Sequence, residues 1–162
     1  MKTKVVLMQT FSIVLCLAAF DLKRPTEEKA IAYPEGYRWW THVKSGFIGP
    51  QHKYFEQTGG YHHIYANTIA MQGFKTGSFP EGSVIVFDVI NFKEDNGSYP
   101  ETTRKRIDVM VKESIYKNTG GWGYEEFKAD SHTESMLNDS TRTQCYTCHA
   151  KMDDSVFSEF RN

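Results

Sequence analysis

Hydrophobic and polar positions along the chain predict a β-sheet in its middle part. Residues 83–92 are almost continuously apolar, which is typical of a strand covered on both faces. Residues 104–114 alternate apolar with charged side chains and predict a half-buried strand, antiparallel to the first across a long polar turn. Residues 61–67 are rich in aromatic and β-branched side chains, and a further short strand ends near Phe127. We therefore expect about four antiparallel strands.

Helical patterns flank these predicted strands. Residues 37–44 predict a short helix, and residues 68–74 have the length of two helical turns. A third helix is expected close to the C-terminus, where Thr141 and Gln144 have the spacing of a capping box. The fold class that follows is α+β, predominantly antiparallel sheet with flanking helices.

The length and net charge of the chain limit the number of domains and the classes of partner to expect. A chain of 162 residues is long enough for one sizeable core, and 40% hydrophobic residues is an ordinary globular value. The formal net charge of −1 gives no reason to expect a nucleic acid or an acidic membrane as partner.

The N-terminal stretch, residues 1–19, has the pattern of a secretory signal peptide. Lys2 and Lys4 form a positive start, and residues 5–17 are mostly apolar. An uncleaved membrane anchor is the alternative, but the apolar run is too short and too interrupted for a span. We therefore expect export to the periplasm.

Domain boundaries follow from this reading. Residues 20–35 are expected to be a loose lead-in, and residues 36–162 the single domain. Cleavage would also remove Cys16, so that Cys145 and Cys148 would be the two remaining cysteines and no structural disulfide is expected.

The strongest chemical pattern is Cys145-Tyr146-Thr147-Cys148-His149, which matches the C-x-x-C-H attachment sequence of a c-type haem. Residues three and four apart share one face of a helix, so Cys145, Cys148 and His149 would project together. We expect one covalent haem c on this C-terminal helix, with both thiols bound to the haem and His149 as an axial iron ligand.

A C-x-x-C pair has two other common uses in proteins. It could be half of a zinc site, but the chain has no second cysteine pair to complete it. It could also be a thioredoxin-type dithiol, but no βαβ pattern surrounds it. Histidines that could in principle complete a zinc site have no recognisable spacing; they are His52, His62, His63 and His132.

The position of the motif bears on the second axial ligand of the iron. Met152 follows His149 too closely to reach the other side of the iron, and Met71, Met110 and Met136 are the upstream alternatives. We expect an open or weakly occupied position, which suits small-ligand binding more than simple electron transfer. A four-helix cytochrome c-prime is excluded because the middle of the chain predicts strands.

Several further segments, in their order and spacing, resemble the cytochrome P-460 family and its relative cytochrome c-prime-beta. The resemblance covers most of residues 36–160. The segments are Gly36-Tyr37-Arg38-Trp39-Trp40, His63-Ile64-Tyr65-Ala66-Asn67, Gly77-Ser78-Phe79-Pro80-Glu81-Gly82-Ser83-Val84-Ile85-Val86, Thr119-Gly120-Gly121-Trp122-Gly123, the haem motif and Val156-Phe157-Ser158. The resemblance implies a mainly antiparallel β fold, a periplasmic homodimer and one haem c with His149 as proximal ligand.

The resemblance also implies two alternative activities. Cytochromes P-460 oxidise hydroxylamine and carry a lysine joined covalently to the haem, whereas c-prime-beta members bind nitric oxide in an apolar pocket capped by phenylalanine. Lys75 is the position that best matches the cross-linking lysine; otherwise it is a solvated lysine at a helix end. We expect hydroxylamine or a related nitrogen compound as substrate and an unidentified redox partner protein as electron acceptor.

Further site residues are predicted from the same resemblance and from their chemistry. Phe79, with Phe74, could cap the haem pocket, and Arg38 could pair with a haem propionate because its fork suits carboxylates. Glu125 or Glu126 could accept a proton during hydroxylamine oxidation, which removes protons together with electrons. The alternatives are core packing for Phe79 and surface positions for the charged residues.

Overall fold

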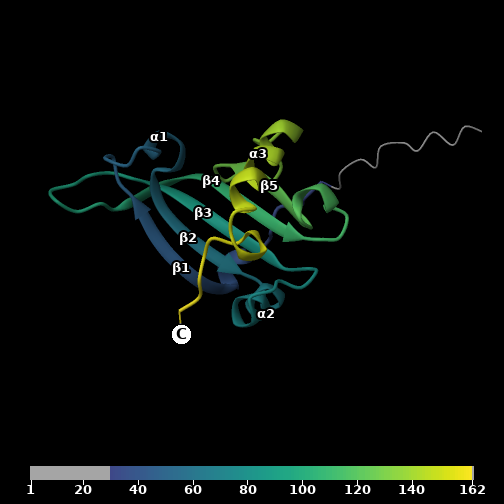
Figure 1. The fold of residues 1–162 in the computed structure, drawn as a ribbon. Coiled ribbons are helices and arrows are strands. Elements are labelled where there is room, and N and C mark those ends of the chain that lie inside the picture. The colour runs from purple at the N-terminus through teal and green to yellow at the C-terminus, as the bar shows by residue number, and fades with distance from the viewer. Residues whose placement is uncertain (1–29, 162) are drawn as a thin grey trace, which may run out of the picture.

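The computed structural model describes residues 30–161, which form a five-stranded antiparallel sheet with flanking helices (Figure 1). Each strand pairs with the next along the chain, so the sheet is a simple meander. The strands are β1 (Thr41–Ile48), β2 (Gly60–Ala66), β3 (Val84–Phe92), β4 (Glu101–Lys112) and β5 (Trp122–Lys128). The predicted α+β class is confirmed.

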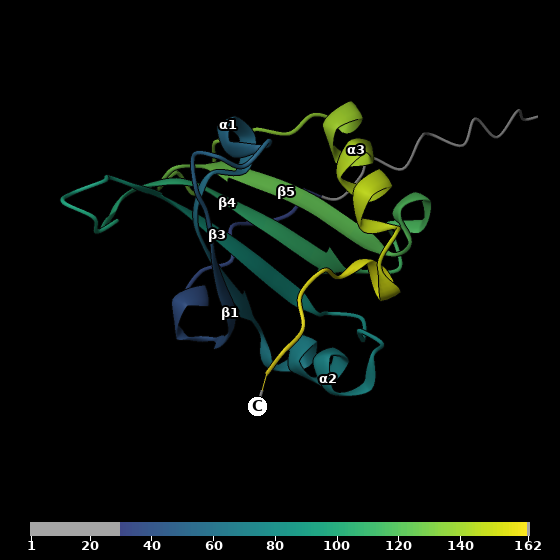
Figure 2. The same cartoon turned by 60° about the vertical axis from the view of Figure 1, so that its left-hand side comes forward.

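The helices lie in the connections and after the sheet. The α-helices are α1 (Phe55–Thr58), α2 (Thr68–Thr76) and α3 (Asp139–His149), and the 3-10 helices are η1 (Tyr37–Trp39), η2 (Lys117–Thr119) and η3 (Asp153–Ser155). Figure 2 shows α3 beside β5 and the C-terminal segment crossing the sheet towards α2.

Helix α2 has clear start and stop residues. The Asn67 side chain accepts a hydrogen bond from the backbone N–H of Ala70, which caps the first turn. Gly77 follows the last turn with φ of 79°, a left-handed conformation that glycine adopts without steric cost. The predicted helix over 68–74 is confirmed.

The predicted helix over 37–44 is wrong beyond its first turn. Only Tyr37–Trp39 is helical, and Thr41 already pairs with Ala66 of β2. The β-branched Thr41 and Val43 suit a strand, and pairing with β2 outweighs the weak helical pattern of this segment. The capping box of α3 was also misplaced, because Asn138 and Thr141 form it.

The sheet has two differently built faces. Tyr124, Trp122, Ile64 and Ile85 share one buried cluster, and Cys145 of α3 packs against it; we call this side the motif face. Tyr37, Val86, Ile107, Val109 and Phe127 form the cluster on the opposite side, which we call the Asp88 face because Tyr37 bonds Asp88 there.

The predicted signal peptide, residues 1–19, lies outside the described residues, as does most of the predicted lead-in. Within residues 30–161, no helix is long and apolar enough to cross a membrane.

Candidate functional site

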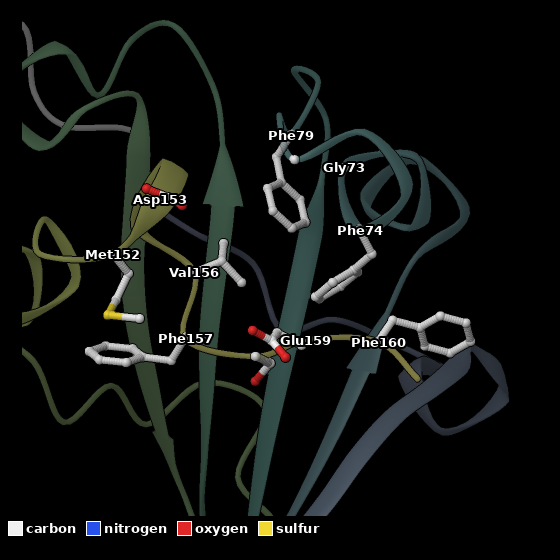
Figure 3. Close-up of a pocket in the computed structure, with 11 residues that line it drawn as sticks. Gly73, Phe74, Phe79, Met152, Asp153, Val156, Phe157, Glu159 and Phe160 are labelled. Atoms are coloured by element: carbon white, nitrogen blue, oxygen red, sulfur yellow. The ribbon is translucent and has the colours of Figure 1, made fainter. Parts of the chain in front are cut away.

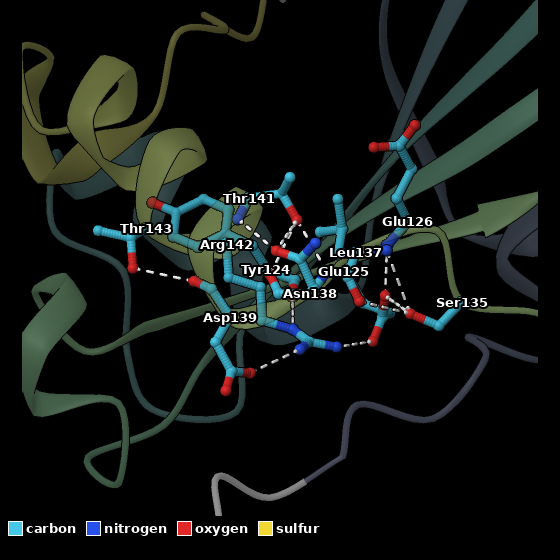
Figure 4. Close-up of polar contacts among 10 residues, drawn as sticks. All are labelled: Tyr124, Glu125, Glu126, Ser135, Leu137, Asn138, Asp139, Thr141, Arg142 and Thr143. Carbon is cyan, nitrogen blue, oxygen red and sulfur yellow. Dashed lines mark hydrogen bonds and ion pairs between the residues drawn. The ribbon is translucent and has the colours of Figure 1, made fainter.

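Helix α3 is fastened to the edge strand β5 by a polar network (Figure 4). Arg142 donates to Glu125 at 2.7 Å and to the backbone oxygen of Tyr124 at 3.3 Å. Ser135 donates to the same carboxylate at 2.6 Å. These contacts fix the helix that carries the C-x-x-C-H motif against the sheet.

The His149 imidazole is oriented by a backbone carbonyl. Its Nδ1 lies 2.8 Å from the oxygen of Ser155, and its ring packs against the rings of Tyr124 and Phe157, with centroids 5.2 and 4.8 Å away. Burial lowers the pKa of His149, which favours the neutral imidazole that a metal requires. Since Nδ1 is engaged, Nε2 is the nitrogen left to bind a metal.

A cavity of about 400 Å³ lies between α2 and the C-terminal segment (Figure 3). Phe79 contacts Phe74 edge-to-face at 5.0 Å and Trp122 at 5.6 Å. Phe157 both contacts His149 and lines the cavity, so the cavity adjoins the motif. Its lining is rich in phenylalanine: Phe74, Phe79, Phe157 and Phe160.

The family model described as Cytochrome P460 matches residues 34–158 of this chain. The chain belongs to the cytochrome P460 family. The suspected family is thereby confirmed, and the protein is a haem cytochrome. No curated protein matches the chain.

Haem fits the residues around the motif of this cytochrome P460. Two reduced thiols, half-buried Cys145 and exposed Cys148, stand with His149 on one helix. Beside them, the Tyr124 hydroxyl is buried and makes no hydrogen bond of normal geometry within residues 30–161, although the Ser155 side chain lies near enough to act on its pKa. Burial raises that pKa, so the hydroxyl stays a donor. An orphaned buried donor at this point suits a site that a further group completes.

A zinc site gains no support from the same region. Among the residues that the structure describes, no three His, Cys, Asp or Glu side chains are grouped so that they could hold a metal ion. The donor set of α3 thus suits haem better than the zinc alternative.

The carboxylates next to the motif are arranged differently from the prediction. Alternation along β5 turns Tyr124 and Glu126 to the motif face and Glu125 away from it. Both oxygens of Glu125 are engaged, by Ser135 and by Arg142. The predicted role of Glu125 as a base is therefore replaced by a role in holding α3.

Sequence reasoning missed a charged cluster on the motif face. Arg106 on β4 bonds Asp108 at 2.8 Å and Glu126 on β5 at 2.9 Å. Burial raises the pKa of both carboxyls, and burial together with the Asp108 and Glu126 charges raises the pKa of the Cys145 thiol. Asp108 and Glu126 are cross-strand partners, so only the strand register could have revealed the cluster.

Arg38 does not lie near the haem motif. Its guanidinium donates to Asp88 from Nε at 3.1 Å and from a terminal nitrogen at 2.7 Å, on the opposite face of the sheet. The cause is local, since η1 buries Tyr37 on the Asp88 face and carries Arg38 with it. The predicted contact between Arg38 and a haem propionate is corrected to this ion pair.

The structure places the two residues predicted from the α2 region, Phe79 and Lys75, differently with respect to the cavity. Phe79 is buried in the core cluster and also lines the cavity, which fits both the capping role and core packing, so its capping role stays a prediction. Lys75 is exposed at the end of α2, next to the cavity-lining Phe74 but not itself in the lining. Its cross-link to haem stays a prediction.

Proposed function

We propose that this cytochrome P460 carries one covalent haem c on Cys145 and Cys148 and oxidises hydroxylamine or a related small nitrogen compound. One observation carries the proposal: the His149 ring is held by the Ser155 carbonyl with Nε2 left for iron, on the same helix as two thiols. Metal-binding histidines commonly donate their other ring nitrogen to a carbonyl or carboxylate.

The residues around the site have distinct tasks in this proposal. When bound, the haem supplies a redox-active iron that accepts electrons from a nitrogen compound. Phe79 and the other cavity phenylalanines give the pocket an apolar part against which a small ligand can pack. The Asp108–Glu126 pair, whose pKa values are raised by burial, can take up a proton released by the substrate.

Location and partners belong to the same proposal. The protein acts in the periplasm after export, as a homodimer, and passes electrons to a separate redox protein. The second axial position of its haem is open or held by a displaceable ligand.

A second function, binding of nitric oxide without turnover, is favoured by one observation. Four phenylalanines line the cavity, and Lys75 lies outside it. The phenylalanine part of such a pocket suits a small uncharged ligand and offers no group that could accept a proton. A simple electron carrier is the third alternative.

Turnover of hydroxylamine with an artificial electron acceptor separates these functions. The proposal expects turnover by the haem-loaded protein and a large loss of it in Glu126→Gln. The matched control is Glu134→Gln, an exposed carboxylate paired with Lys128, which should leave the rate unchanged. Uptake of NO without hydroxylamine turnover would instead support the second function. A methionine-ligated low-spin iron that takes up neither ligand would contradict both.

A further inference from the structure

The turn directly after the haem motif has an unusual backbone. Asp154 and Ser155 have φ of 41° and 62°, in the left-handed region that side chains other than glycine rarely adopt. Such conformations persist only where surrounding contacts hold them, and they are concentrated at functional sites. We therefore expect specific contacts to hold this turn in place.

Asp154 ties the turn to three separate parts of the fold. Its Oδ2 accepts the backbone N–H of Phe79 at 2.7 Å, and its Oδ1 accepts Lys112 Nζ at 2.5 Å. The indole N–H of Trp122 donates to the Asp154 backbone oxygen at 2.9 Å and lies 3.3 Å from Oδ1. The segment before β3, the end of β4 and the start of β5 thus converge on one side chain.

The next residue connects this anchor to the haem motif. The carbonyl of Ser155, which is buried, accepts the hydrogen bond of His149 Nδ1. The direction of that carbonyl depends on the backbone dihedrals of Asp154 and Ser155. Asp154 therefore controls the group that orients His149, although its own hydrogen bonds go to Phe79, Lys112 and Trp122.

We propose that Asp154 is a positioning residue that sets the strength and direction of the His149 hydrogen bond, and thereby the electronic character of the axial ligand. The inference rests on the proposed function, in which His149 binds the iron. A firm bond from Nδ1 to a carbonyl makes the imidazole a more basic ligand, and hydrogen bonding around the axial ligand is one means by which a protein sets a haem potential.

Variants at Asp154 separate its side chain from its backbone conformation. Asp154→Gly tolerates positive φ but removes the anchor, whereas Asp154→Asn keeps an oxygen acceptor and loses the charge facing Lys112. On ferrous haem-loaded protein we expect the iron–imidazole stretching frequency to fall in Asp154→Gly and the reduction potential to rise. Asp154→Asn should shift both in the same direction by less.

Lys112→Met provides an independent test from the other partner. It keeps an apolar stem beside Trp122 and removes the cation that bonds Asp154. We expect the stretching frequency and the reduction potential to shift in the same direction as in Asp154→Asn. The double variant Asp154→Asn/Lys112→Met should shift them no further than the larger of the two single variants, because both substitutions remove the same contact. If Asp154→Gly does not yield haem-loaded protein, Asp154→Asn and Lys112→Met decide the matter.

The matched control is Asp95→Asn. Asp95 is exposed in the turn between β3 and β4, distant in sequence from Asp154, so this variant should leave the iron–imidazole frequency and the reduction potential unchanged. Wild-type frequency and potential in all Asp154 and Lys112 variants would overturn the inference, even if stability fell. Absence of an iron–imidazole band in the wild-type protein would instead contradict the proposed function itself.

Discussion

On the Asp88 face one buried carboxylate meets two guanidinium groups and a phenol, whereas on the motif face two carboxylates share one guanidinium. Asp88 is fully buried and accepts from Tyr37 at 2.6 Å, Arg38 at 2.7 Å and Arg104 at 2.8 Å. Burial alone would raise the pKa of Asp88, but these hydrogen bonds hold it below its ordinary value.

The motif face leaves its charges incompletely matched. There burial raises the pKa of Asp108 and of Glu126, and the Tyr124 hydroxyl makes no hydrogen bond of normal geometry in the described part of the chain. Asp108 and Glu126 lie close enough to the motif to raise the pKa of the Cys145 thiol. Carboxyls with perturbed pKa values are often found at functional sites, while fully paired ion clusters are typical of structural ones. The Asp88 face is therefore built as a structural ion cluster, and the motif face is the one on which we propose the chemistry takes place.

The largest loss of stability is expected for Asp88→Ala, which removes the centre of the ion cluster on the Asp88 face. Removing the carboxylate leaves Arg38 and Arg104 without their buried partner, which costs about 3–5 kcal/mol of unfolding free energy. Urea denaturation measures this loss. The matched control, Asp95→Ala at an exposed turn, should change the unfolding free energy by less than about 0.5 kcal/mol. A similar small change for Asp88→Ala would contradict the structural role of that face.

The pH dependence of the unfolding free energy tests the structural role of the Asp88 carboxylate in a second way. Because the folded-state pKa of Asp88 is depressed, its contribution is fully present above the unfolded-state pKa of about 4. It is lost as the pH falls through the lower folded-state pKa. Denaturation of wild-type protein and Asp88→Asn should therefore differ most at neutral pH, and the difference should shrink below about pH 4. A difference that does not change with pH would exclude this linkage.

Glu125 and Glu126 are neighbours on β5, and their variants separate the structural role of Glu125 from the proposed proton-accepting role of Glu126. Glu125→Gln weakens the bond to Arg142 and should cost about 1–3 kcal/mol of unfolding free energy, with an unchanged pH profile of turnover. Glu126→Gln should alter stability less and shift or abolish the pH dependence of turnover. The reverse pattern would show that the faces of β5 have been assigned wrongly.

The smallest effect on stability is expected for Lys75→Ala. Lys75 is exposed, so its removal should change the unfolding free energy by less than about 0.5 kcal/mol. If Lys75 is joined to the haem, the wild-type ferrous Soret band is broadened and red-shifted, and the variant regains an ordinary c-type spectrum. An ordinary wild-type spectrum would make Lys75 a surface lysine and favour NO binding.

Local patterns predicted much of the fold, and long-range contacts account for what they missed. The apolar run of β3 and the capping residues of α2 are visible in short stretches of sequence. Which face receives a side chain depends on pairing, and so Arg38 and Glu125 were given the wrong neighbours. Asp154 meets Phe79 across 75 positions, which no local pattern reveals.

The central claim is that Cys145 and Cys148 hold haem covalently, and denaturing extraction tests it most directly. The full chain is produced in cells that attach c-type haem, next to the Cys145→Ala/Cys148→Ala double variant. After acid-acetone treatment, wild-type haem should stay with the polypeptide in a one-to-one ratio by pyridine haemochrome, and haem of the double variant should extract. Wild-type haem that extracts freely into the solvent would contradict the account.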